Sequence, residues 1–145
     1  MHIARSALVT HAAVDMYRLV HDVASYPEFL SWCTQAEVLE DQPQLQVASL
    51  SINVGGMTQR FTTRNRLEPG ARLVLSLVEG PFRELVGEWR FQQLGDAGSK
   101  ISLSLDFEVS SRLMASAFSK GFSHVADRLV RDFGRRADAV YGGLA

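Results

Sequence analysis

The chain has 145 residues, of which 46% are hydrophobic and 21% charged, and its formal net charge is −1. This composition excludes disordered and collagen-like chains, and the balanced charge is unlike that of a dedicated DNA-binding protein. A chain of this length buries about two thirds of its surface on folding, so we expect residues 1–145 to form one domain with its own core.

Local features of the sequence bear on where the protein works. Cys33 is the single cysteine, so no intramolecular disulfide can form. The N-terminal residues lack the basic and apolar segments of a secretory signal, and no apolar run approaches the length of a membrane-spanning helix. We therefore expect a cytoplasmic protein.

The first elements are a strand and two helices. Extended residues run from His2 to Thr10, and Thr10 stands where it could cap a helix over 11–22. The segment Ser25-Tyr26-Pro27 breaks that helix, and Pro27 can open a second, short one because its missing amide is no loss at the first position.

From Cys33 to Val109 apolar residues alternate with period two, interrupted by turn residues at 41–43, 55–56, 69–70, 80–81 and 95–98. This pattern predicts an antiparallel meander, which with the first strand gives a seven-stranded sheet. In the last strand Leu103, Leu105 and Phe107 share one face, and polar residues fill the other, as a half-buried strand requires.

The remainder, from Ser111 to Gly142, predicts one long amphipathic helix, because its apolar residues recur at steps of three and four. These residues are Met114, Phe118, Phe122, Val125, Leu129, Phe133, Ala137, Val140 and Leu144. The fold class is therefore α+β, with the long helix laid into the concave side of a curved sheet. Such a sheet cannot contact a straight helix everywhere, so a cavity is expected between them unless large side chains fill it.

Three motifs carry a family resemblance: Tyr26-Pro27-Glu28-Phe29-Leu30-Ser31-Trp32-Cys33, then Gly80-Pro81-Phe82, then Gly87-Glu88-Trp89-Arg90-Phe91. With the order of elements, they resemble the coenzyme-Q-binding START-like family of the helix-grip, polyketide cyclase/dehydrase-like superfamily. The resemblance implies a helix-grip fold without catalysis that holds a hydrophobic molecule such as ubiquinone and supports respiratory quinone function. Bacterial members described as toxins imply an alternative, which is binding to the large ribosomal subunit that blocks subunit joining.

The candidate ligand site consists of aromatic and apolar residues on inward-facing positions. We expect cavity walls at Phe61, Trp89, Phe91, Phe107, Met114, Phe118 and Phe122, and an entrance around Tyr26, Phe29, Trp32 and Phe82. Thr63, Asn65 and Gln93 share strand parity with these residues and are candidates for the few polar groups that a ligand pocket needs. The alternative is that the aromatic residues simply fill the core.

The sequence predicts neither a catalytic nor a metal site, and no cofactor beyond the bound quinone. Its histidines and single cysteine form no known metal or nucleophile motif. Cys33 lies beside Trp32 with no basic neighbour to stabilise a thiolate, which favours a packed thiol.

Arginines gather on two predicted faces. Arg128, Arg131 and Arg135 share a face of the terminal helix with His124, and a second row on a strand consists of Arg60, Arg64 and Arg66. Ion pairs on a solvated face explain such rows. The alternative is an electrostatic surface for ribosomal RNA or for peripheral contact with an anionic membrane, and for the ribosome we expect Arg128, Arg131 and Arg135 to carry it.

Overall fold

The computed structural model describes residues 1–114 and 116–142. Its elements in chain order are β1 (His2–Val9), α1 (Ala13–His21), η1 (Val23–Glu28), β2 (Cys33–Gln42), β3 (Leu45–Val54), β4 (Met57–Glu68), β5 (Arg72–Glu79), β6 (Phe82–Leu94), β7 (Gly98–Val109), η2 (Ser111–Leu113) and α2 (Ala117–Tyr141). The η elements are 3-10 helices.

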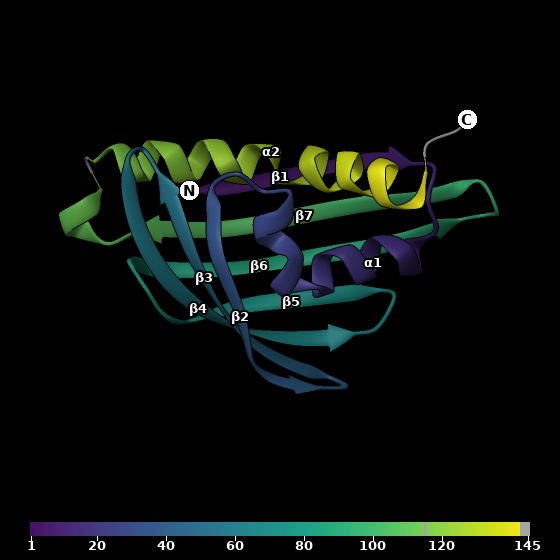
Figure 1. The fold of residues 1–145 in the computed structure, drawn as a ribbon, viewed down its shortest axis with the longest axis horizontal. Coiled ribbons are helices and arrows are strands. Elements are labelled where there is room, and N and C mark those ends of the chain that lie inside the picture. The colour runs from purple at the N-terminus through teal and green to yellow at the C-terminus, as the bar shows by residue number, and fades with distance from the viewer. Residues whose placement is uncertain (115, 143–145) are drawn as a thin grey trace.

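One sheet of seven strands has the order β1-β7-β6-β5-β4-β3-β2, and every neighbouring pair is antiparallel. The strands β2 to β7 form a meander in sequence order, and β1 closes on β7. The sheet curves around α2, while α1 and η1 lie beside the helix on the same side (Figure 1). The predicted α+β architecture, a curved sheet gripping a long C-terminal helix, is confirmed.

The turn between β3 and β4 meets the start of α2 at very short range. Gly55 has a φ of +59°, and a Cβ built there would lie 2.3 Å from the carbonyl oxygen of Ala117. A Cβ on Gly121, one helical turn later, would lie 3.0 Å from Gly55 N. Glycine is therefore required at Gly55 both for the left-handed backbone and for the close approach.

The first two helices differ in detail from the prediction. The helix α1 begins at Ala13, and its N-cap is Ala12 with no side-chain cap, so the expected capping by Thr10 is wrong. Gln93 of β6 reaches across instead, and its Oε1 accepts a hydrogen bond from Ala13 N at 2.8 Å. The second helix begins at Val23, with Pro27 near its end rather than its start.

The terminal helix is shorter than predicted. It begins at Ala117, because the chain first makes the 3-10 turn η2, and Met114 lies before the helix with 46% of its surface exposed. Val140 at the other end is exposed too, and Leu144 lies outside the described residues. The fully buried face of α2 follows Phe118, Phe122, Ala126, Val130, Phe133 and Ala137. No helix in the described part of the chain is long and apolar enough to cross a membrane.

Candidate functional site

A cavity of about 100 Å³ lies between the sheet and α2. Inward-facing residues of the strands form its floor, because alternate residues of a strand point to the same face. The pairing of neighbouring strands places Asn65 of β4 opposite Leu75 of β5, and Leu73 of β5 opposite Trp89 of β6. The residues that line it are Val20, Val23, Tyr26, Trp32, Ala48, Leu50, Phe61, Thr63, Asn65, Leu73, Leu75, Leu85, Trp89, Leu105, Phe122, Val125, Ala126, Leu129 and Phe133.

The volume of the cavity limits what fits without movement. An apolar cavity of roughly 150 Å³ takes one benzene molecule, and sites for larger ligands occupy roughly 300–1,000 Å³. The cavity of about 100 Å³ is therefore smaller than a single aromatic ring needs. The half-buried residues of its lining are Tyr26, Trp32, Leu50, Leu75, Val125 and Leu129. Four of them, Trp32, Leu50, Val125 and Leu129, lie on α2, on β3 and just before β2, so we expect side chains there to move aside.

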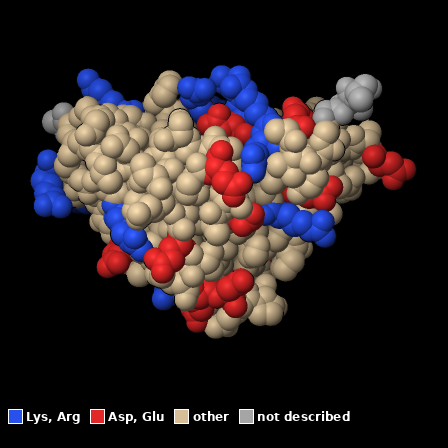
Figure 2. Space-filling view, in the orientation of Figure 1, with Lys and Arg blue, Asp and Glu red and all other residues tan. Residues whose placement is uncertain are grey.

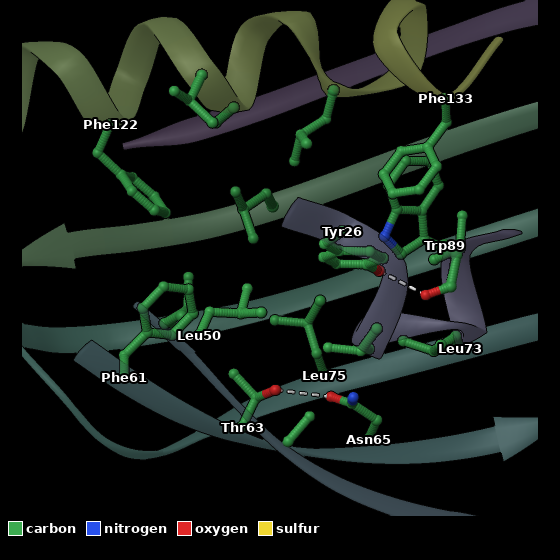
Figure 3. Close-up of a pocket in the computed structure, with 18 of the residues that line it drawn as sticks. Tyr26, Leu50, Phe61, Thr63, Asn65, Leu73, Leu75, Trp89, Phe122 and Phe133 are labelled. Carbon is green, nitrogen blue, oxygen red and sulfur yellow. Dashed lines mark hydrogen bonds between the residues drawn. The ribbon is translucent and has the colours of Figure 1, made fainter. Parts of the chain in front are cut away.

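Tyr26 forms a fixed part of the wall (Figure 3). Its hydroxyl donates a hydrogen bond to the carbonyl oxygen of Val20, and its ring packs edge-on against Phe133 with centroids 5.4 Å apart. Burial raises the pKa of Tyr26 above its ordinary value, so the hydroxyl stays neutral.

One side of the cavity is polar. Thr63 Oγ1 donates to Asn65 Oδ1 at 2.9 Å, Asn65 Nδ2 donates to Gln46 Oε1 at 2.9 Å, and Gln46 Nε2 donates to the His21 carbonyl at 2.8 Å. Figure 3 shows the first of these bonds below the apolar side chains. Thr63 and Asn65 thus lie where strand parity placed them, whereas Gln93 does not, because it is exposed and caps α1.

Of the aromatic residues expected at the site, Tyr26, Trp32, Phe61, Trp89 and Phe122 line the cavity. Phe29 lies behind this wall. Its ring packs against Tyr26 and Phe133, and the Arg136 guanidinium lies 4.8 Å from its centroid on the outer side. Phe29 therefore supports the wall and has no direct contact with the cavity.

The other expected residues are elsewhere. Phe82, Phe107 and Phe118 pack around Phe122, with Phe82 4.8 Å and Phe107 4.9 Å from it. Together with Phe61 these residues form what we call the phenylalanine cluster, which fills the space at the start of α2. Phe82 is thus buried and lies at no entrance.

Phe91 and Met114 also lie away from the cavity. Phe91 is on the inner face of β6. Its ring stacks on Trp89 and meets Tyr17 edge-on, and it does not line the cavity. Met114 is exposed because it precedes α2 and so cannot continue the buried face of the helix.

Sequence reasoning missed several residues that line the cavity. Leu73 and Leu75 alternate cleanly in the sequence, and Val125, Leu129 and Phe133 recur at helical spacing, so a signal for them existed. The buried residue Gln46 had none, because a polar residue on a strand ordinarily predicts a solvent-facing position.

Cys33 is 3% exposed, and its thiol donates to the carbonyl oxygen of Gln35. Burial raises the pKa of this thiol to about 11, so the nucleophilic thiolate is disfavoured at neutral pH. Within residues 1–114 and 116–142, no three His, Cys, Asp or Glu side chains come together as a metal-binding group.

The arginines of α2 divide into paired and unpaired ones. Arg136 pairs with Glu28, whereas Arg128, Arg131 and Arg135 form no ion pair with another described residue. Arg131 and Arg135 are exposed and Arg128 is half-buried. Figure 2 shows Lys and Arg side chains gathered along the upper edge, where α2 runs.

The arginines of β4 likewise include one that forms an ion pair and two that form none with the described residues. Arg60 pairs with Glu37 at 3.1 Å, while Arg64 and Arg66 are exposed on the outer face of β4. The two faces therefore both offer uncompensated positive charge.

Curated relatives match nearly the whole chain. "Ribosome association toxin RatA" of Vibrio cholerae is 45% identical over 140 residues, covering 97% of this chain and 97% of the relative. "Coenzyme Q-binding protein COQ10 homolog B, mitochondrial" of Xenopus laevis is 27% identical over 144 residues, covering 96% of this chain and 59% of the relative.

Solved structures share the fold. The Zhui aromatase/cyclase of Streptomyces sp. R1128 has a TM-score of 0.82 at 19% identity and covers 99% of both chains. A START superfamily protein of Mycobacterium smegmatis has a TM-score of 0.80 at 16% identity, covering 96% of this chain and 98% of that one. The family described as "Polyketide cyclase / dehydrase and lipid transport" matches residues 9–134. The chain therefore belongs to this START-like family.

Proposed function

We propose that the protein binds a hydrophobic small molecule, ubiquinone or a related isoprenoid lipid, between the sheet and α2. The observation that carries this function is the cavity itself, which combines a continuous apolar wall with one polar side at Thr63 and Asn65. That combination is typical of sites for apolar ligands with a small polar head. A relative named as coenzyme Q-binding supports the choice of ligand class.

Burial of the ligand's hydrocarbon supplies the affinity. Each buried CH₂ group contributes about 0.8 kcal/mol, so an isoprenoid chain gains enough to compete with a membrane. The wall must first open, since the cavity holds about 100 Å³. We expect Val125 and Leu129 to move, because they are half-buried and belong to one helix.

The wall favours binding without catalysis. General acid–base or nucleophilic chemistry needs a titratable or nucleophilic side chain in reach of the ligand. Among the described lining residues none is Asp, Glu, His, Lys, Arg or Cys, and the two hydroxyl groups belong to Tyr26 and Thr63. The Tyr26 hydroxyl is bonded to the Val20 carbonyl and has a raised pKa, and the Thr63 hydroxyl is bonded to Asn65 with no base beside it in the described lining. The aromatase/cyclase name belongs to a structure 19% identical to this chain, a level at which the likeness concerns the fold.

A cavity-filling variant tests the function. Ala126→Leu places a larger side chain into the cavity from α2, and Ala139→Leu makes the same change on an exposed turn of the same helix. Each protein is purified under native conditions, extracted with organic solvent, and analysed for quinones and lipids by mass spectrometry. We expect wild type and Ala139→Leu to carry or take up ubiquinone and Ala126→Leu to take up at least tenfold less.

Empty wild-type protein that takes up no added ubiquinone or isoprenoid lipid would contradict the proposed function. Equal uptake by the two leucine variants would place the ligand outside the cavity.

A second candidate function is ribosome association, which the names of the bacterial relatives favour. The structural observation behind it is the exposed, unpaired pair Arg131 and Arg135 among the described residues of α2. Arginine suits RNA phosphates because its planar guanidinium binds them through two hydrogen bonds. In this function the protein acts in the cytoplasm on the large ribosomal subunit.

Charge reversal separates the two candidates. We expect Arg131→Glu with Arg135→Glu to abolish co-sedimentation with the large ribosomal subunit and to leave quinone uptake unchanged. Arg64→Glu with Arg66→Glu reverses the same charge on the sheet and serves as the matched control. Ribosome binding that survives the α2 reversal would remove this surface from the function.

A further inference from the structure

The polar side of the cavity comes from β4, and a residue of the adjacent strand β3 supports it from behind. Thr63 and Asn65 are two residues apart on β4 and so face the same way, and Gln46 lies directly opposite Asn65 on β3. All three residues are buried, with exposed fractions of 9%, 4% and 2%. Buried polar groups form hydrogen bonds with each other, with water or with a ligand. A donor that has no protein acceptor here is therefore a candidate to bind a ligand.

The hydrogen bonds on this side have a fixed direction. The His21 carbonyl can only accept, so Gln46 presents Nε2 to it and turns Oε1 toward Asn65. Asn65 must therefore donate from Nδ2, and its Oδ1 must accept the proton of Thr63. An amide nitrogen carries two N–H groups, and among the described residues Asn65 Nδ2 has one acceptor. One N–H of Asn65 thus has no acceptor among the described residues, and Asn65 lines the cavity.

Trp89 supplies a second donor on the same wall. It is 3% exposed and lines the cavity, and its Nε1 makes no hydrogen bond with any other described residue. Figure 3 draws the indole with its nitrogen at the end nearer Tyr26. This nitrogen is not among the fully enclosed side-chain nitrogens that lack a partner, so it keeps some surface that a small molecule can reach. Asn65 on β4 and Trp89 on β6 flank β5, where they lie opposite Leu75 and Leu73, and all four residues line the same cavity.

The charge of the wall restricts the ligand further. Within the described lining no side chain is cationic, so a carboxylate or phosphate head would lose its water without gaining a counter-charge. A neutral carbonyl oxygen needs only a donor. The donors of Asn65 and Trp89 fit that requirement.

Building on the proposed ligand-binding function, we propose that the cavity selects neutral ligands whose head carries carbonyl oxygens. The head is held by the free N–H of Asn65 and by the indole N–H of Trp89, above β5. The hydrocarbon part extends toward Phe122 and leaves between Leu50 and Val125, which are half-buried. Selectivity for a quinone-like head over a bare hydrocarbon then comes from these two donors, and selectivity over a fatty acid comes from the absence of a cationic side chain in the described lining.

Three probes with the same tail test this selectivity in the wild-type protein: a short-chain ubiquinone analogue, the alkylbenzene that lacks its oxygens, and a fatty acid. Binding is followed by quenching of tryptophan fluorescence and by isothermal titration calorimetry. We expect the quinone to bind about a hundredfold more tightly than the alkylbenzene, about tenfold for each of the two hydrogen bonds. We also expect it to bind more tightly than the fatty acid.

Two variants assign the donors. Asn65→Leu and Trp89→Phe each remove one of the two proposed donors and keep an apolar wall, and Leu75→Met changes the wall without changing a donor. Asn65→Leu also removes the hydrogen bonds of Asn65 to Gln46 and Thr63. We expect each of the first two to weaken quinone binding about tenfold and to leave alkylbenzene binding within about threefold, while Leu75→Met alters both probes equally. Trp89→Phe alone decides the test if Asn65→Leu does not fold.

The outcomes are distinguishable. Equal affinity of wild type for the quinone and the alkylbenzene, or equal losses for both probes in Asn65→Leu and Trp89→Phe, would overturn the donor assignment while cavity binding stands. Tightest binding of the fatty acid would overturn the neutral-head requirement. Failure of all three probes to bind would overturn the proposed function itself.

Discussion

The two ends of the space between the sheet and α2 are built from the same strands but are packed differently. At the start of α2 the phenylalanine cluster fills the space, and Gly55 brings the β3–β4 turn against Ala117. Farther along the helix the inward residues are Val125, Ala126 and Leu129, and the cavity opens there.

The size of successive side chains explains the difference. Along β4 the inward row passes from Phe61 to Thr63 and Asn65, and α2 passes from Phe122 to Ala126. Glycine holds the helix close at one end, so the smaller residues beyond it leave free volume instead of letting the helix settle onto the sheet. The comparison teaches that the start of α2 is fixed against the sheet, while the next stretch of the helix, between Phe122 and Phe133, leaves room for a ligand.

Removal of a large side chain from the closed end has the largest expected effect. Phe118 is 0% exposed, so Phe118→Ala should lower the free energy of unfolding by about 3–5 kcal/mol. Leu85 lines the cavity, and Leu85→Ala should cost less, about 2 kcal/mol, because its neighbours already face free space. Urea denaturation followed by circular dichroism measures both. Equal losses would show that the two ends are packed alike.

The glycine contact at the closed end gives the next effect. Gly55→Ala combines a positive φ with a Cβ 2.3 Å from Ala117 O, so it should destabilise by about 2 kcal/mol. Gly56 has a φ of +76° but no atom within 4 Å of the added Cβ, so Gly56→Ala isolates the backbone strain. A smaller loss for Gly56→Ala in thermal unfolding is expected. Identical losses would mean that the approach of α2 contributes nothing.

Alkaline pH tests the region beside the cavity, where Cys33 is buried. Burial raises the pKa of the Cys33 thiol from 9.0 to about 11 in the folded protein. Below pH 9 the thiol is neutral in both the folded and the unfolded chain, so it has no effect on how stability varies with pH. As pH rises from 9 toward 11 the unfolded chain loses this proton first, so the free energy of unfolding falls. At pH 10 the linked loss in the free energy of unfolding is about 1.4 kcal/mol. Cys33→Ala should lack this part of the decline in denaturation curves at pH 8 and pH 10. An unchanged decline in the variant would assign it to tyrosines.

The smallest effect concerns α1, which borders the cavity through Val20. Gln93→Ala removes the acceptor for Ala13 N and should destabilise by about 1 kcal/mol. Gln92→Ala changes the same residue type on the opposite face of β6 and should have little effect. Hydrogen exchange of the α1 amides measures the difference, and equal exchange in both variants would contradict capping by Gln93.

The sequence predicted the architecture because its patterns are local. Alternation placed Leu73, Trp89 and Leu103 on one face of the sheet, and helical spacing placed Phe118, Phe122 and Phe133 on one face of α2. Such patterns specify which residues face inward. They do not specify how closely the side chains of the sheet and of α2 approach each other. Phe91, Phe107 and Phe118 were therefore expected at the cavity but are packed beside it.

Non-local contacts account for the remaining differences. Gln46 is buried because Asn65 and the His21 carbonyl, both distant in sequence, satisfy its amide. Gln93 caps a helix that lies 80 residues earlier in the chain. No periodicity encodes either contact, so a prediction from sequence assigns such residues by polarity alone.

The pairing of β1 with β7 also determines when the fold can be completed. His2 lies opposite Asp106 and Val9 opposite Ser99, so the first strand has its partner near the far end of the chain. Contacts between residues this far apart slow folding. During synthesis β1 waits as an unpaired strand until β7 has left the ribosome, and unpaired strand edges are sites of aggregation. The sheet therefore closes late in folding, and until then the chain carries an unpaired edge that a chaperone can recognise.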